Sequence, residues 1–438
     1  MRCRPRFVLS MLLLITASPA VNGWAQTDSR PSPAPEWVQE VDQLLDQRAY
    51  EQARQRLTWA AQSDADPQVV ETMARRIDAA QQARLEALSG QLDALLEDRQ
   101  STKAEQLLVQ LIALGAEQDT IKAYRVAIEN SLKYGRYQPG NVFQDPWQRP
   151  HQSNVDQSQP SPTMVVLPQG RFMMGSARFE QGHRTNEAPR HRVTIPSGFA
   201  MSQTEITVAQ FRAFVQATGY RTHAERSGRG RVYDPKTRRI TQRQGMDWRS
   251  DYRGQPALDT LPVVRVSWSD AQAYVAWLSR MTGHRYRLPS EAEFEYALRA
   301  GQQWRFPWGD EPPREPVDNV AGEADRSPTG AQWAVSFPNF GDGHWGPAPV
   351  GEFQPNRFGL YDTGGNVSEW TEDCWHDNYV RAPKNGAPWV NRGCDQRVIR
   401  GGAWTSTPLL ARAAHRQARS SDWADVQVGF RVVRALEP

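Results

Sequence analysis

The sequence FGLYDTGGNVSEW, residues 358–370, opens the stretch around which the C-terminal part of the chain is organised, and RGGAW, residues 400–404, closes it. Glycine pairs beside aromatic residues favour tight turns and a close approach of two backbones. Asp362, Asn366 and Glu369 carry hard oxygen ligands at the spacing of a loop, which suits a calcium ion. The alternative interpretation of this pattern is a turn-rich piece of a large core.

The length of 438 residues predicts two domains, because single cores rarely grow beyond about 250–300 residues. The 52 basic and 49 acidic residues leave a net charge of +3, and no basic run occurs, so a nucleic-acid partner is not expected. The 16 tryptophans, 31 glycines and 31 prolines indicate a loop-rich fold that packs on aromatic side chains.

Residues 1–25 have the pattern of a secretory signal peptide. An arginine-rich start precedes an apolar run over residues 7–17, which is too short to span a bilayer. Small residues favour cleavage after Ala25, and residues 18–20 offer an alternative site. No later stretch is apolar enough to cross a membrane. We therefore expect a soluble, periplasmic or secreted protein with no membrane attachment after cleavage.

Residues 36–134 are rich in Ala, Leu, Gln, Glu and Arg and contain an internal repeat. An offset of 51 residues relates LLDQR at 44–48 to LLEDR at 95–99. Each repeat is predicted to form a helical hairpin, with turns near residues 64–67 and 115–117, which gives a small all-α helical-hairpin repeat region. Such a region suits docking of a protein or envelope ligand, or it is a plain spacer.

Residues 135–162 have the composition of a linker, and a larger domain over residues 163–435 follows. We predict two strands within residues 164–176, a strand at 191–195, and helices at 207–219, 267–283 and 290–299. Each helix begins at a Ser or Thr with Gln, Asp or Glu three residues later, which is the pattern of a capping box. Residues 222–260 lack periodicity, so we predict a long loop that lines a cleft or is simply solvated.

Motifs of this domain occur in the order of one known family. They are MMGS at 173–176, TEIT at 204–207, VSW at 266–268, RLPSEAEFEY at 287–296, FPWG at 306–309, GLYDTGGNVSEW at 359–370, RGGAW at 400–404 and GFR at 429–431. The chain from Met164 to Arg434 therefore resembles the formylglycine-generating enzyme, or sulfatase-modifying factor, family. The resemblance implies a mixed α/β, loop-rich fold that is related to C-type lectins, with the helical region lying outside it.

The resemblance also implies two structural calcium sites. The matching residues are Asp362, Gly365, Val367 and Glu369 at one site, and Asn319, Val320, Asp342 and His344 at the other. Carboxylates together with backbone carbonyl oxygens are good calcium ligands, so calcium is the expected cofactor. The alternative at each site is an Asx-type turn without metal.

Cys374 and Cys394 are the only cysteines after Cys3, which would leave with the signal peptide. They could serve as metal ligands, reactive thiols or a disulfide. Export favours a disulfide, and their spacing is not that of a zinc site. A loop of this size would be stabilised by about 3 kcal/mol.

The chain departs from the resembled family at the copper site. Formylglycine-generating enzymes hold copper with two cysteines that follow the RGG motif, and those positions match Ser406 and Ala411 here. Soft sulfur is what selects this metal, so copper is not expected. Sulfoxide synthases of the family use iron held by a His-rich helical domain, but no histidine precedes residue 151 here. A periplasmic branch that matures the siderophore pyoverdine fits better.

Two hypotheses remain open at this stage. One is an exported, divergent oxidative or modifying enzyme that does not generate formylglycine. The other is a non-catalytic, lectin-like binding module with a helical docking arm. The cleft candidates for either are Arg400, Trp404, Ser406, Arg412, His415 and Arg416. Their alternative role is structural, with the arginines bridging loops.

We expect the mature protein to begin near Gln26, because the apolar run is short and small residues precede the predicted cleavage site. N-terminal sequencing of the protein from a periplasmic extract checks this. An intact Met1 in the membrane fraction would contradict it.

Overall fold

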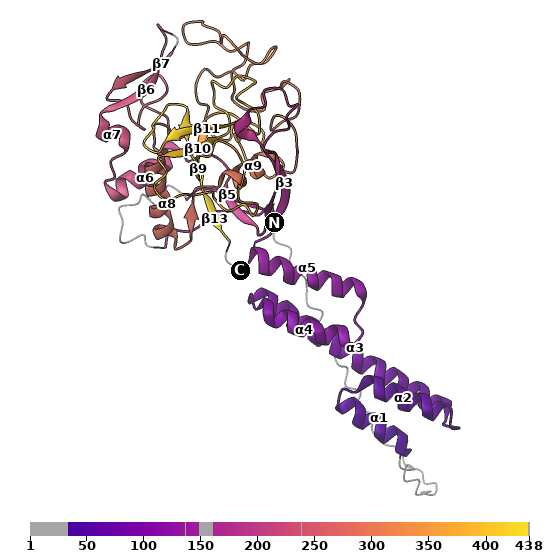
Figure 1. The fold of residues 1–438 in the computed structure, drawn as a ribbon. Helices are drawn as coiled ribbons and strands as arrows, with labels where there is room; N and C mark the ends of the chain where they lie inside the picture. The colour runs from indigo at the N-terminus through magenta and orange to yellow at the C-terminus, as the bar shows by residue number, and fades with distance from the viewer. Residues whose placement is uncertain (1–33, 136, 149–160, 238, 437–438) are drawn as a thin grey trace, which may run out of the picture. The chain divides into compact units, whose positions relative to one another are not determined.

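The computed structural model describes residues 34–135, 137–148, 161–237 and 239–436 (Figure 1). The predicted signal peptide lies outside these residues. Backbone contacts divide the chain into two compact units, with the division between Ser89 and Gly90 inside one helix. No helix in the described ranges is long and apolar enough to cross a membrane.

The first unit consists of α1 (Glu36–Asp46), α2 (Tyr50–Ala61) and most of α3 (Pro67–Glu97). Apolar residues at helical spacing point inward, and Val41, Ala53 and Ile77 are fully buried in its core. The amphipathic spacing of the sequence thus provides the small core that holds this unit together.

The repeat of 51 residues is visible in the backbone. α4 (Ser101–Ala113) begins 51 residues after α2, and α5 (Gln118–Tyr134) begins 51 residues after α3. The turns before α2 and α4 each place an arginine in the left-handed conformation, with φ of 60° at Arg48 and 58° at Arg99. The predicted turns near residues 64–67 and 115–117 are confirmed as the α2–α3 and α4–α5 connections.

Each repeat contains three helices, so the hairpin prediction was incomplete. The last part of α3, residues 87–97, lies 51 residues after α1 and acts as the first helix of the second repeat. No proline follows Pro67 within α3, and a Cβ at Gly90 would meet no atom within 4 Å. The two helices therefore continue into one another without the break that the prediction required.

The second unit contains a five-stranded antiparallel sheet. Its order is β1 (Val142–Phe143), β2 (Met164–Leu167), β5 (Phe199–Ser202), β13 (Val433–Ala435) and β8 (Tyr286–Arg287). β13 pairs with β5 and with β8, which fastens the end of the domain to the middle of the sheet. β1 corrects the linker prediction, since Phe143 pairs with Met164 and Asp145 is buried. The linker-like composition of this segment gave no sign that Tyr137, Phe143 and Trp147 pack on the core.

A second sheet and two ribbons complete the strands. The sheet has the order β11 (Arg416–Ser420), β10 (Gln396–Arg400), β9 (Ser368–Cys374) and β12 (Val428–Gly429), and the ribbons pair β3 (Gly170–Met174) with β4 (His191–Ile195) and β6 (Arg229–Asp234) with β7 (Arg239–Gln244). Within this sheet β9 and β12 run parallel. β9 and β10 run antiparallel, and Glu369 of β9 lies opposite Arg400 of β10.

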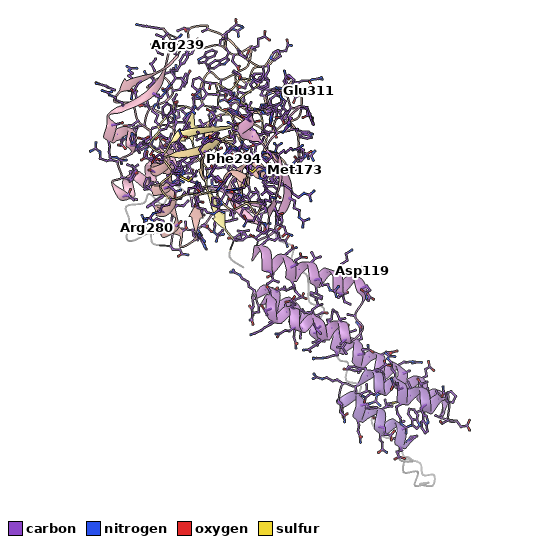
Figure 2. The ribbon with its side chains drawn as sticks, in the orientation of Figure 1. Asp119, Met173, Arg239, Arg280, Phe294 and Glu311 are labelled. Atoms are coloured by element: carbon purple, nitrogen blue, oxygen red, sulfur yellow. A yellow bond between two sulfur atoms is a disulfide. The ribbon has the colours of Figure 1, made fainter. Side chains whose placement is uncertain are left out.

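Three helices begin where their capping boxes predict. α6 (Val208–Thr218), α8 (Trp268–Thr282) and α9 (Glu291–Arg299) follow Thr207, Ser267 and Ser290, whose side chains each accept the backbone N–H three residues on. α6 and α8 lie side by side and share an aromatic core (Figure 1). Phe294 of α9 lies in the interior of the domain, whereas Asp119 projects from α5 (Figure 2).

Residues 222–260 are more ordered than predicted, because they form α7 (His223–Ser227) and the ribbon of β6 and β7. The cause lies outside the segment. Arg265 is fully buried and donates to the carbonyl oxygens of Arg231, Ser250 and Asp251 at 2.6 to 2.7 Å. The guanidinium of Arg265, just past this segment, thus joins three of its backbone carbonyl oxygens, although the sequence of the segment has no periodicity.

Replacing Ser290 with Ala should destabilise the domain more than replacing Ser267 with Ala. Both hydroxyls cap a helix, which is worth about 1 kcal/mol, but Ser290 also donates to the buried Gly386 carbonyl at 2.7 Å. We expect an extra loss of about 1 kcal/mol. Denaturant unfolding followed by tryptophan fluorescence measures both variants, and equal losses would contradict the role assigned to the second bond.

Candidate functional site

The loop before β9 brings the predicted calcium ligands together. Asp362 and Asn366 both have positive φ, 58° and 55°, so the backbone turns sharply at each. A Cβ at Gly365 would lie 2.3 Å from the Asn319 carbonyl oxygen, so only glycine fits. Oδ2 of Asp362 accepts a hydrogen bond from the Gly351 N–H at 2.6 Å.

Glu369, the second predicted carboxylate ligand, lies at the start of β9 and already has a partner. It is fully buried, and both its oxygens contact Arg431 at 2.8 to 3.0 Å. Val367 buries its side chain in the aromatic cluster around Trp404. The four residues matched to this site therefore share one loop, but Glu369 is engaged by a guanidinium.

Glu205 is a carboxylate of this region that the sequence analysis missed. It is fully buried just before α6, and its carboxyl group lies beside that of Asp362, with which it shares a side-chain hydrogen bond. Burial raises its pKa well above the ordinary value, and the charges of Asp362 and Glu369 raise it further, while Arg431 lowers it. The TEIT motif placed Glu205 at a helix start but gave no sign of its closeness to the loop.

The donor set suits a cation only with help from the backbone. Three carboxylates around Arg431 leave an excess of buried negative charge, which a divalent cation would neutralise. Within the described ranges, no group of three or more His, Cys, Asp or Glu side chains is arranged as a metal site by itself. Calcium would therefore draw on carbonyl oxygens such as those of Gly365 and Val367, as the ligand set requires.

The residues matched to the other calcium site also come together. Asp342 accepts hydrogen bonds from the backbone N–H groups of Val320 and His344, each at 2.9 Å, and the second bond is an Asx-type turn. Burial raises the pKa of Asp342 to about 7, and the neighbouring Asp325 contributes in the same direction. Oδ1 of Asn319 is buried without a partner in the described chain. The alternative that was left open, a turn, is thus present.

Arg400 and Arg416 are buried cleft candidates that bind the start of α9. Arg416 contacts Glu291 at 2.7 and 2.8 Å, and Arg400 pairs with Glu295. Glu291, Glu293 and Glu295 each pair with a different arginine, namely Arg416, Arg287 and Arg299. Both candidate arginines therefore have the bridging arrangement that was the alternative to a catalytic role.

Arg412 is equally engaged, with the loop that follows β3. It contacts Glu187 at 2.5 and 2.8 Å and Glu180 at 2.9 Å. Glu187 is fully buried at the end of a short 3₁₀ helix, η2 (Thr185–Glu187). A guanidinium held by two carboxylates has little capacity left to bind a substrate anion.

His415 is a cleft candidate with both of its ring nitrogens unmatched among the described residues. It is 2% exposed. Burial lowers its pKa to about 3, and the positive charges of Arg184, Arg412 and Arg400 lower it further. The imidazole is therefore neutral and poorly satisfied, which is rare for a buried polar group and marks this position for attention.

Ser406 and Ala411 occupy ordinary packed positions. The Ser406 hydroxyl accepts a hydrogen bond from the Ala403 N–H at 2.9 Å, and its side chain is buried. Ala411 packs in an aromatic cluster with Phe306 and Phe337. Between them they offer one hydroxyl oxygen and no sulfur to a metal.

Trp404, the last cleft candidate, packs with Tyr233, Tyr252 and Trp333 in a separate cluster. Its indole N–H is buried without a partner among the described residues. Ser406 and Trp404 are close in sequence, yet the Trp404 ring packs in an aromatic cluster whereas the Ser406 hydroxyl bonds to the backbone.

The two cysteines form the predicted disulfide. Cys374, at the end of β9, is joined to Cys394, with 5.9 Å between their Cα atoms. The bond closes the loop before β10. Neither sulfur replaces a copper ligand while the disulfide is intact.

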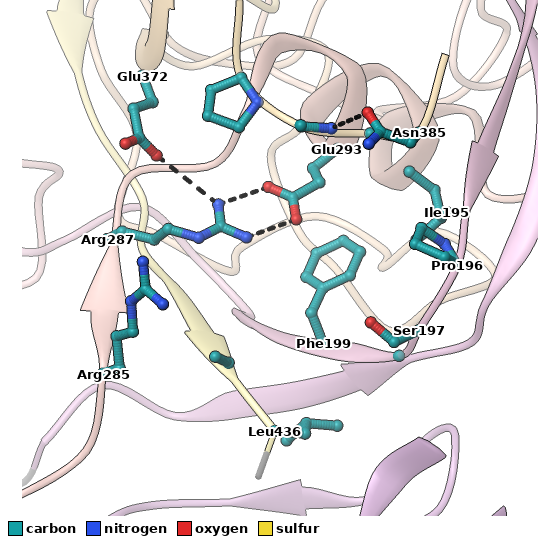
Figure 3. A pocket seen from close by; sticks show the side chains of 15 residues that line it. Ile195, Pro196, Ser197, Phe199, Arg285, Arg287, Glu293, Glu372, Asn385 and Leu436 are labelled. Atoms are coloured by element: carbon teal, nitrogen blue, oxygen red, sulfur yellow. Dashed lines mark hydrogen bonds and ion pairs between the residues drawn. The ribbon is translucent and has the colours of Figure 1, made fainter. Parts of the chain in front are cut away.

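A cavity of about 290 Å³ lies between β8, β13 and the loop after β4 (Figure 3). Arg287 points into it, binds both oxygens of Glu293 at 2.6 Å and lies 4.0 Å from Glu372. The guanidinium of Arg287 is therefore already paired with carboxylates that line the cavity, which leaves this side chain little affinity for an anion.

Comparison with known proteins agrees with this architecture. A formylglycine-generating enzyme of Streptomyces coelicolor is 34% identical over 296 residues, which cover 61% of this chain and 87% of that protein. An "Inactive C-alpha-formylglycine-generating enzyme 2" of Mus musculus is 33% identical over 300 residues, which cover 62% of this chain and 85% of that protein. The structure of PvdO from Pseudomonas aeruginosa matches with a TM-score of 0.51 and 34% identity, over 68% of this chain and all of that chain.

The matched region has clear limits. Residues 150–436 match the sulfatase-modifying factor enzyme 1-like domain, so the helices α1 to α5 lie outside it. The match covers well over half of the chain, and the chain belongs to the sulfatase-modifying factor family.

Proposed function

We propose that this chain is an exported, divergent modifying enzyme of the family that does not generate formylglycine. The observation that carries the proposal is the chemistry at Ser406 and Ala411, the positions matched to the copper-binding cysteines. A hydroxyl committed to a backbone N–H and a methyl group packed among phenyl rings supply no soft ligand. The relatives include proteins named as active enzymes and others named as inactive, so membership alone leaves activity open.

A modifying role without copper is supported by His415. A buried neutral imidazole with two unmatched nitrogens is costly to keep, and such groups occur where chemistry or a bound polar ligand needs them. The alternative, a lectin-like binding module with a helical docking arm, is supported by the arginines, which are all engaged in ion pairs. Docking of a protein or envelope ligand by the helical region stays a prediction.

The exported location is supported by two independent features. The first 25 residues have the pattern of a signal peptide. The disulfide between Cys374 and Cys394 suits an oxidising compartment, since disulfides persist outside the reducing cytosol. A periplasmic or secreted protein accounts for both.

We also propose that calcium binds at the Asp362 loop. The adjacent buried carboxyl groups of Asp362 and Glu205 are the support, because two carboxylates held together in the core are costly without a cation. Bound calcium would neutralise the negative charge that these side chains bring into the core.

Calcium should raise the melting temperature of the protein, and a chelator should lower it. Binding to the native state alone adds about 2.7 kcal/mol at a concentration 100 times the dissociation constant. Asp362→Ala should remove the response. Glu205→Gln should remove it too, because it takes away one of the two adjacent carboxyl groups.

Asp119→Ala, a change on the exposed face of α5, is the control and should keep the full calcium response. Differential scanning fluorimetry with calcium, with EGTA and with magnesium makes the comparison. A parent protein with the same melting temperature in calcium and in EGTA would overturn the calcium proposal.

The protein should leave the cysteine of a sulfatase-type peptide unconverted in the presence of copper and oxygen. No thiolate stands at the matched positions to hold the metal and activate oxygen. Mass spectrometry of the peptide measures the aldehyde directly. Copper-dependent formation of formylglycine would refute both the proposal and the assignment of the positions.

The variant carrying Ser406→Cys and Ala411→Cys checks the assignment itself. It should bind copper(I) in a competition assay with a chromogenic chelator, while the parent protein should not. If neither protein binds copper(I), the two positions are not placed to share a metal, and the matched positions are misassigned.

A further inference from the structure

A cavity of about 440 Å³ lies beside the loop between β3 and β4, outside every residue predicted as part of a site. Eight residues of the segment between β3 and β4 line it, together with Asn378 and Val380. The charged side chains that line it are Arg178 and Arg190, and no carboxylate is among its lining residues. The cavity is therefore basic in character.

The two arginines are available to a ligand. Both are exposed, and neither forms an ion pair within the described residues. Arg190 donates to the side-chain oxygen of Gln303 at 2.6 Å, which positions it but leaves its charge uncompensated. The nearby acids, Glu180 and Glu187, are both engaged by Arg412 behind the wall.

A chain of hydrogen bonds fixes the tautomer of His183, which also lines the cavity. The Glu187 carboxylate is held by Arg412 and accepts the hydroxyl proton of Ser176 at 2.6 Å. Ser176 has one proton to give, so its contact of 2.7 Å with His183 must be donated by the Nδ1–H of the histidine. In the neutral imidazole the second ring nitrogen, Nε2, is then an acceptor.

The backbone holds this arrangement in place. The Ser176 N–H donates to the Glu187 carbonyl oxygen and closes the loop, and a Cβ at Gly175 would lie 2.3 Å from that oxygen. A Cβ at Gly182, just before His183, would lie 2.8 Å from Leu409. The loop is packed tightly at both places, so the histidine is presented by a fixed wall.

We propose that this cavity binds an oxyanion that still carries a proton at neutral pH, the chemistry of inorganic phosphate. The guanidinium groups of Arg178 and Arg190 would bind the oxygens, as arginine commonly does. Nε2 of His183 would accept the P–OH proton. The site goes beyond the proposed function, and it holds whether or not the domain is an enzyme.

With Nε2 of His183 as an acceptor, the site would distinguish phosphate from sulfate, which charge alone would not do. Sulfate has the same shape as phosphate but no proton at neutral pH, so an oxygen lone pair would face the lone pair of Nε2. A hydrogen bond that involves a charged group is worth about 1.5–3 kcal/mol, so phosphate should bind at least about tenfold more tightly than sulfate.

Isothermal titration calorimetry of the whole chain at neutral pH tests the proposal with inorganic phosphate, sulfate and glycerol 3-phosphate. Arg178→Gln and Arg190→Gln should each weaken phosphate and sulfate alike. His183→Ala should weaken phosphate and abolish the preference over sulfate. Arg171→Gln, an exposed change on β3 away from the cavity, is the matched control and should change neither.

Ser176→Ala distinguishes the contribution of the hydrogen-bond chain to phosphate binding from the contribution of the arginine charges. Without the hydroxyl, Nδ1 is no longer committed as the donor, so the preference for phosphate should narrow while sulfate still binds. Circular dichroism and the melting temperature confirm that each variant is folded. Glycerol 3-phosphate is mostly unprotonated at neutral pH, because its second pKa is about 6, so it should bind more weakly than inorganic phosphate.

Two results would overturn the proposal. One is equal affinity of the parent protein for phosphate and sulfate, because the acceptor role of Nε2 would then be wrong. The other is phosphate affinity unchanged in Arg190→Gln, a variant of an exposed side chain whose folding is not at risk.

Discussion

Buried pairs of arginine and glutamate hold this loop-rich domain together. Arg416 binds Glu291 across 125 residues of sequence, and Arg412 binds Glu187 across 225. Each pair joins a C-terminal segment to an element formed much earlier in the chain, where short strands provide few backbone hydrogen bonds. Removing one partner of such a pair costs about 3–5 kcal/mol, because the remaining charge stays buried. The two segments of each pair therefore depend on one another.

The same pairing limits the chemistry of the domain. An arginine that is paired with a buried carboxylate has little capacity to bind another anion or to transfer a proton. The ion pairs of Arg400, Arg412 and Arg416 therefore join elements of the fold. What is left for chemistry lies at the edges of the network. His415 sits behind it with unmatched nitrogens, and His183 receives its tautomer from it through Ser176.

Local features were predictable, whereas the partners across the fold were not. The capping boxes at Thr207, Ser267 and Ser290 fixed three helix starts, because a cap depends on residues within one turn. Glu205 was missed because its closeness to Asp362 arises from tertiary folding, over about 150 residues, which no local pattern records. Residues 222–260 were misjudged for the same reason, since Arg265 orders them from outside.

The frame and the chemistry of this domain are physically separable. Ala411 fills its position by packing against phenyl rings, and Arg412, the next residue, fixes the path of the backbone through Glu187. Loss of sulfur at Ala411 therefore removes a metal ligand without removing an interaction that holds the loop. The wall that carries His183 is likewise anchored by Gly175 and Glu187, so side chains between these anchors can change the ligand that is bound while the fold stays the same.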